Sequence, residues 1–202
     1  VKPDGAGFVV DKHETFMVGL GNTDVEFGPD GRMYLSCFNN NGWYKQDIGN
    51  VYTLFNRDRA GSEEVALTRE LLLSDFGEKE DTDLDRMLAF GDMRVRQRAQ
   101  FELVERNQSE ILIAAAEQTD HRLKRLHGIW GLGQLARKDP SLYHHHIDWL
   151  TDSDGEVRAQ CARILSDSRL TSSGEALTLA LDDPSARVRS FAAIGVGKCR
   201  IP

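Results

Sequence analysis

Three consecutive histidines are the first candidates for chemistry in this chain, because imidazole nitrogens are common ligands of transition metals. They are His144, His145 and His146. On a helix, successive side chains point about 100° apart, whereas ligands that converge on one ion need the spacing of a helical turn. We therefore expect surface or inter-helix positions for the three histidines and assign no metal site.

A second group of candidates combines His127 and Trp130, three residues apart, with a locally basic strip. The strip contains Arg94, Arg96, Arg98, Lys124 and Arg125. One interpretation makes His127 and Trp130 a recognition spot; the favoured one makes them inter-repeat packing with the indole N–H satisfied. The strip could accept an acidic partner, but its acidic neighbours favour a solvated face of ion pairs. The candidate interaction surface is Arg94, Arg98, Lys124, His127 and Trp130.

Other chemical motifs are weak. Asp24 and Asp30 could be cation ligands, but Asp30 lies in a turn, which favours local backbone hydrogen bonds. No Ser/His/Asp triad or P-loop is visible, and the Gly-x-Gly pairs lack the context of a dinucleotide site. Cys37, Cys161 and Cys199 show no metal or haem spacing. We assign no catalytic residue and no cofactor.

The second half of the chain repeats itself, which indicates how these residues are positioned. An apolar residue follows a polar capping residue at Val95, Leu123, Val157 and Val188, at intervals of 28, 34 and 31 residues. This period predicts an α-solenoid of helical hairpins. Small residues one turn later allow close packing, and second helices are expected at 109–118, 142–150 and 174–181.

A basic residue directly follows the apolar one in every repeat. These residues are Arg96, Lys124, Arg158 and Arg189. We expect each to pair with an aspartate of an adjacent loop, a structural ladder that we favour over a ligand site. The apolar residues Val95, Ala99, Leu123, Val157, Leu165 and Val188 are expected to be buried.

The first half of the chain predicts strands instead. Short β-branched and aromatic segments lie at 7–10, 15–18, 24–27, 33–38 and 51–55, with a strong turn at Gly28-Pro29-Asp30-Gly31. Residues 1–57 are therefore an antiparallel β segment, residues 58–81 a charged joint with a short helix at 62–73, and residues 82–202 the solenoid. This order predicts the α+β class.

Composition narrows the function further. A formal charge of −7 without a basic block argues against nucleic acid as a partner. No apolar run approaches the 18 or so residues that span a bilayer. The chain lacks an initiator Met, so we expect it to be a piece of a longer protein.

At this point the chain resembles a family. Residues 23–35, TDVEFGPDGRMYL, resemble a blade of the six-bladed propellers of sorbosone- and glucose-dehydrogenase type. Residues 92–101, DMRVRQRAQF, and 125–135, RLHGIWGLGQL, resemble HEAT repeats. Together they resemble the large membrane-bound dehydrogenases of planctomycetes and related bacteria, in which a propeller precedes HEAT repeats and often a c-type haem domain. The resemblance implies a periplasmic or membrane-associated parent, redox-active on sugars or related alcohols.

The function expected for this chain is a non-catalytic protein-interaction scaffold that forms the HEAT-repeat part of such a parent. The alternative is a contribution to a quinone-dependent dehydrogenase active site in the intact parent. A repeat enzyme of the bilin-lyase type is supported by the repeat alone. The expected partner is a protein or another domain of the parent chain. We also expect a homodimer through the β segment, because a lone sheet leaves part of its apolar set uncovered: Val25, Phe27, Met33, Leu35, Val51 and Leu54.

Overall fold

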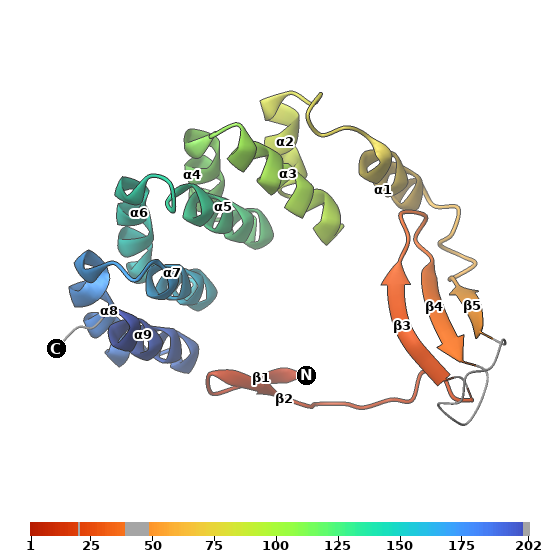
Figure 1. Ribbon diagram of the computed structural model, residues 1–202, viewed down its shortest axis with the longest axis horizontal. Helices are drawn as coiled ribbons and strands as arrows, with labels where there is room; N and C mark the ends of the chain where they lie inside the picture. Colours follow the sequence, from red (N-terminus) through yellow and green to blue (C-terminus); the bar gives the residue numbers. More distant parts are fainter. Residues whose placement is uncertain (20, 39–48, 200–202) are drawn as a thin grey trace. The chain divides into compact units, whose positions relative to one another are not determined.

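The computed structural model describes residues 1–19, 21–38 and 49–199, and the chain divides into two compact units. The first unit is residues 12–75, and the second combines residues 1–11 with residues 76–202. Strands followed by helices confirm the α+β class (Figure 1). Among the described residues, every helix is too short or too polar to cross a membrane.

The unit of residues 12–75 is built on a three-stranded antiparallel sheet. Its strands are β3 (Gly21–Phe27), β4 (Met33–Phe38) and β5 (Gly49–Leu54), in the order β3-β4-β5. The turn between β3 and β4 closes with a hydrogen bond from the Gly28 N–H to the Arg32 carbonyl, 2.8 Å long. Gly31 takes a φ of +72°, which glycine adopts without strain. Helix α1 (Glu63–Leu73) follows, capped by the Ser62 hydroxyl.

The register of this sheet decides which side chains share a face. Val25 pairs with Leu35 and Phe27 with Met33, so these four lie on one face, as expected from their alternation. Val51 pairs with Ser36 and therefore belongs to the opposite face, so its expected place in the same apolar set was wrong. Successive residues of a strand point to opposite faces of the sheet, so the strand register decides which face Val51 occupies.

The first hairpin also differs from expectation. Strand β1 (Lys2–Asp4) pairs antiparallel with β2 (Gly7–Val9), and β2 matches the predicted segment 7–10. The strand predicted at 15–18 is absent, and Phe16 is three-quarters exposed. Its β-branched and aromatic residues are not enough, because a strand also needs a partner to complete its backbone hydrogen bonds.

The second unit is a stack of helical hairpins in two layers (Figure 1). One layer contains α2 (Asp81–Met87), α4 (Ser109–Glu117), α6 (Tyr143–Asp148) and α8 (Gly174–Leu179). The other contains α3 (Met93–Glu105), α5 (Arg122–Leu135), α7 (Gly155–Ser168) and α9 (Ala186–Lys198). In the second layer each helix contacts the next, α3 with α5, α5 with α7 and α7 with α9. Short 3₁₀ turns flank α6 and α8, at Pro140–Leu142, Trp149–Thr151, Thr171–Ser173 and Ala180–Asp182.

The core lies between these two layers. Val95, Val157 and Val188 are fully buried, as are Ala99 and Leu165, and these five expectations are confirmed. Leu123 is 45% exposed, so its expected burial was wrong. Helix α5 starts one residue later than the repeat alignment assumed, which puts Lys124 in the inward position.

Candidate binding groove

The helices α3, α5 and α7 begin with comparable caps, which sets their side chains in register. The Asp92 carboxylate accepts a hydrogen bond of 2.8 Å from the Arg94 N–H, and that of Asp154 accepts one of 2.8 Å from the Glu156 N–H. In α5 the capping group is the His121 imidazole, which accepts from the Lys124 N–H at 3.3 Å. The inward residue is the third of each helix, and the ladder position is the fourth.

Of the four basic residues expected to form the ladder, only Arg158 pairs with an aspartate of the adjacent loop among the described residues. The expectation was wrong for Arg189, which donates to the carbonyls of Asp183 and Pro184. Arg158 donates from Nε to Asp183 in the next loop at 2.7 Å, and both side chains are nearly buried. The Arg158 guanidinium lowers the pKa of the Asp183 carboxyl, and the carboxylate raises the pKa of Arg158. In α5 the equivalent residue is Arg125, which pairs with Asp152 through both terminal nitrogens. Lys124, expected to hold this place, pairs backwards with Asp85 of α2 at 2.8 Å.

Arg96 holds the same position in α3 but meets no carboxylate. Its guanidinium donates to the carbonyls of Phe90 and Gly91, at 2.6 and 2.7 Å, and its Nε donates to His127 Nε2 at 3.2 Å. Because arginine only donates, His127 Nε2 is the acceptor in this contact. The hydrogen of the ring therefore sits on Nδ1, which donates to Gln100 Oε1 at 2.7 Å.

The surroundings of His127 keep this imidazole neutral. Burial, and secondly the charge of Arg96, lower its pKa from 6.5 to about 4. Both ring nitrogens are engaged, so neither is available to take a proton from a substrate. The ring also packs edge-on against Trp130, with the centroids 5.1 Å apart.

Trp130 links α5 to α7. Its indole N–H donates to Gln160 Oε1 at 3.0 Å, and Gln160 in turn donates to Glu156 at 2.6 Å. This agrees with the favoured interpretation, in which His127 and Trp130 belong to inter-repeat packing with the indole N–H satisfied. Gln100, His127, Trp130 and Gln160 thus hold one another through hydrogen bonds and ring packing, so their side chains form a pre-organised surface.

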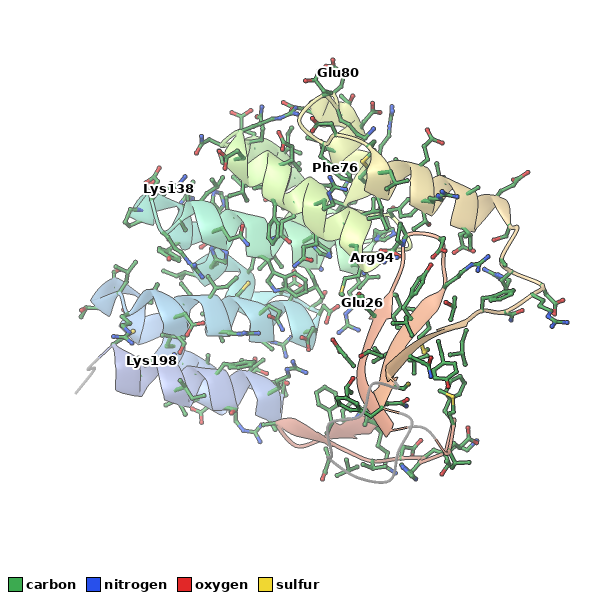
Figure 2. All side chains as sticks on the ribbon, turned by 45° about the vertical axis from the view of Figure 1, so that its right-hand side comes forward. Glu26, Phe76, Glu80, Arg94, Lys138 and Lys198 are labelled. Atoms are coloured by element: carbon green, nitrogen blue, oxygen red, sulfur yellow. The ribbon has the colours of Figure 1, made fainter. Side chains whose placement is uncertain are left out.

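A groove of about 840 Å³ runs over this surface, across α3, α5 and α7. Arg96, Gln100, His127 and Gln160 are buried residues along it, and the exposed side chains of Phe101 and Leu123 also line it. Towards the C-terminal ends of α5 and α7 it is lined by Arg137 and Arg163. The groove therefore combines apolar side chains with arginines. Figure 2 shows the direction of the layer, with Arg94 at the start of α3 and Lys138 and Lys198 at the opposite end.

The structure unites only part of the predicted interaction surface. His127 and Trp130 line the groove together. Arg94 pairs with its own cap Asp92 at 2.8 Å, and the Arg98 guanidinium lies 4.3 Å from the centre of the Phe76 ring. Lys124 is buried in its pair with Asp85.

Sequence reasoning did not single out Gln100, Gln160, Arg137 and Arg163. The two glutamines hold different positions in their repeats, so the repeat pattern carries no signal for them. Arg137 follows α5 and Arg163 lies within α7, and they line one groove only because α5 and α7 pack together. Nothing in the sequence near either residue distinguishes it from other exposed arginines.

The rings of His144 and His145 lie side by side, with 3.9 Å between their centroids, whereas His146 turns into the core. His146 is fully buried, with Nε2 3.1 Å from the Ile129 carbonyl, and burial lowers its pKa to about 4. His144 is exposed, and His145 stacks on Trp149 with 5.6 Å between the ring centroids. In the described part of the chain no group of three potential ligands could hold a metal ion.

Asp30 makes the local bonds expected of a turn residue. Its carboxylate accepts from the Arg32 N–H at 3.3 Å and from the Tyr34 hydroxyl at 3.0 Å. Asp24 likewise accepts from the Val25 N–H, at 2.8 Å. Asp30 also pairs with the Arg32 guanidinium, at 3.4 Å from Nε.

Comparison with known proteins adds little to this picture. No family model matches the chain, and no curated protein matches it. Among solved structures, the chain is similar to a crystal structure of an engineered protein, at 16% identity and a TM-score of 0.45. That match covers 68% of this chain and 72% of the other. No family membership follows from these comparisons.

Proposed function

We propose that this chain is a non-catalytic protein-interaction scaffold that binds a partner in the groove over α3, α5 and α7. The observation that supports it is the pairing of exposed apolar side chains, Phe101 and Leu123, with a floor of buried polar groups already bonded to one another. Such a floor costs little to desolvate, because its donors and acceptors do not lose partners when water leaves.

The chemistry of the floor favours binding over catalysis. A general base needs a free nitrogen or oxygen within reach of the reacting proton. His127, the titratable imidazole of the groove, has both nitrogens in use and a pKa of about 4. Under the proposal the groove recognises a ligand and leaves it unchanged.

The family resemblance suggests a setting for this activity, which we also propose. In a larger extracytoplasmic dehydrogenase of HEAT-repeat type, the occupant of the groove is a segment of another domain or of a partner protein. The exposed apolar residues Val25 and Phe27 of β3 support the further proposal of a homodimer through the β segment.

A peptide selection tests the scaffold. A random dodecamer phage library is selected on the purified chain, on a Leu123→Ser variant and on a Leu179→Ser variant as the matched control. Leu179 is 72% exposed and does not line the groove. We expect peptides from the wild-type selection to lose roughly five-fold in affinity on Leu123→Ser, because an apolar contact is removed, and to be unaffected by the control.

Two results would overturn the proposal. One is a selection in which no peptide is enriched, or in which the enriched peptides bind Leu123→Ser as tightly as wild type. The other is turnover: aldose oxidation with a quinone cofactor and dye acceptor, above a heat-killed control, would show that the chain is catalytic.

A further inference from the structure

Arg96, which lines the groove, differs from the other arginines at the ladder position in what balances its charge. Arg125 and Arg158 each hold an aspartate of the next loop. Arg96 occupies the equivalent place, is 7% exposed, and bonds only to two carbonyls and a neutral imidazole. Arg189 also bonds to carbonyls, but it is exposed, so water balances its charge.

A buried guanidinium without a counter-charge is expensive, because burial removes the water that would otherwise solvate it. No carboxylate of the described residues lies within ion-pair distance of Arg96: burial lowers its pKa, and the charge of Asp92, whose carboxylate pairs with Arg94, opposes this only in part. Its remaining exposure is towards the groove, which it lines. The Nε that holds Asp183 in Arg158 donates to His127 in Arg96, so no described carboxylate occupies this place and an anion can approach the guanidinium from the groove.

The other end of the groove is positive as well. Arg137 and Arg163 are exposed, line the groove and form no ion pair with any described residue. Among the described residues that line the groove, the acidic one is Asp167. Its carboxylate pairs with the Lys198 ammonium, with 2.7 Å between Nζ and Oδ1. A chain with a formal charge of −7 thus carries a groove with three arginines and one already neutralised acid.

We propose that the occupant of the groove is an extended acidic peptide segment of a partner protein. One carboxylate of the segment pairs with Arg96, a second pairs with Arg137 or Arg163, and apolar side chains between them pack on Phe101, Leu123 and Trp130. Two charge contacts at opposite ends fix the direction and register of the segment, and the apolar contacts between them supply affinity. This inference rests on the proposed scaffold function and names its ligand.

The test uses the full chain and the peptides recovered from the dodecamer library. We expect Asp and Glu to be enriched over the input library. A fluorescent copy of one selected peptide is then compared with its Asp→Asn and Glu→Gln copy by anisotropy. We expect the amide copy to bind at least roughly ten-fold more weakly, with the difference shrinking at high salt, since two ion pairs are lost.

Charge variants locate the contact. Arg137→Gln and Arg163→Gln should each weaken binding of the acidic peptide by roughly two- to five-fold, since each removes one exposed pair. Lys138→Gln is the matched control, because Lys138 carries the same charge beside Arg137 but does not line the groove. Neither arginine has an ion-pair partner among the described residues, so both variants are expected to fold.

The outcomes separate the two proposals. Peptides that depend on Leu123 but are not acidic, or that ignore Arg137 and Arg163, overturn the acidic ligand and leave the scaffold standing. Absence of any peptide that depends on the groove overturns both. Tighter binding of a dT12 oligonucleotide than of the acidic peptide, lost in the same arginine variants, would show that the arginines serve nucleic acid and would also overturn the inference.

Discussion

Gly128 of α5 lies close to the backbone of α4, and substituting it tests the packing of α4 against α5. A Cβ atom at this position would lie 2.6 Å from the Leu112 carbonyl oxygen and 2.7 Å from the Ala116 nitrogen. These are backbone atoms of α4, so they cannot rotate away as the end of a side chain can. Gly128→Ala therefore forces the two helices apart.

The expected loss follows from two opposing effects. Overpacking of a filled core costs about 1–3 kcal/mol, and contacts with backbone place this site in the upper part of that range. Alanine gains about 0.8–1.0 kcal/mol over glycine in helix propensity. We expect the free energy of unfolding of Gly128→Ala to fall by about 1–2 kcal/mol.

Gly197 provides the matched control, since a Cβ there meets no atom within 4 Å. The same substitution should stabilise the chain by about 0.5 kcal/mol, because only helix propensity changes near the end of α9. Guanidinium unfolding followed by circular dichroism at 222 nm measures both variants against wild type. The difference between them, about 2 kcal/mol, corresponds to roughly 4–8 °C in Tm. If Gly128→Ala were as stable as Gly197→Ala, the close approach of α4 and α5 would be refuted.

The remaining predictions concern charge and association. The pKa values of His127 and His146 are lowered to about 4, so the unfolded chain binds more protons between pH 6.5 and 4. The free energy of unfolding should therefore fall as the pH is lowered through that window, by up to roughly 3 kcal/mol per histidine. Denaturation midpoints that do not change with pH would contradict this. Asp183→Asn should cost about 3–5 kcal/mol in the same assay because it strands Arg158, and a loss below about 1 kcal/mol would show that the pair is solvated. Light scattering at micromolar concentration should detect a dimer that Val25→Lys reduces to a monomer, and a monomeric wild type would reject dimerisation.

The sequence was sufficient to predict the elements with strong local signals. Strand β4 has the predicted bounds, because its apolar residues alternate between a turn and a second strand. Helix α1 begins after the predicted start Ser62, whose hydroxyl caps it. Of the predicted ladder, the Arg158–Asp183 pair followed from the repetition, whereas Arg96 and Arg189 donate to backbone carbonyls and Arg125 takes the place expected for Lys124. These features depend on short stretches of chain or on the repeat period.

The repeat at α5 shows where such reasoning fails. Its alignment assumed that Asp120 caps the helix, as Asp92 caps α3, but the capping group is His121. The shift of one residue exposes Leu123 and turns Lys124 inwards. A signal was present in the spacing: a small residue, Gly128, follows Lys124 by four positions, as Ala99 follows Val95. The groove had no comparable signal, because it is formed by side chains that meet only when helices from three repeats pack together.

Departures from the repeat pattern gather at the junction of α3 and α5. Here Arg96 lacks the carboxylate that Arg125 and Arg158 hold, and Lys124 replaces a valine in the inward position. A buried ammonium is tolerated because Asp85 of α2 neutralises it, which ties α5 to a helix of the preceding hairpin. The α7 repeat is held by Val157 and the Arg158–Asp183 pair without either exchange, so these exchanges are not required for stacking. Local rules tend to be broken where a chain serves function instead of stability, and the groove begins at this junction. This coincidence supports the proposal that a ligand is recognised at the Arg96 end of the groove. It favours that end over the region of α7 and α9, where the repeat pattern is kept more closely.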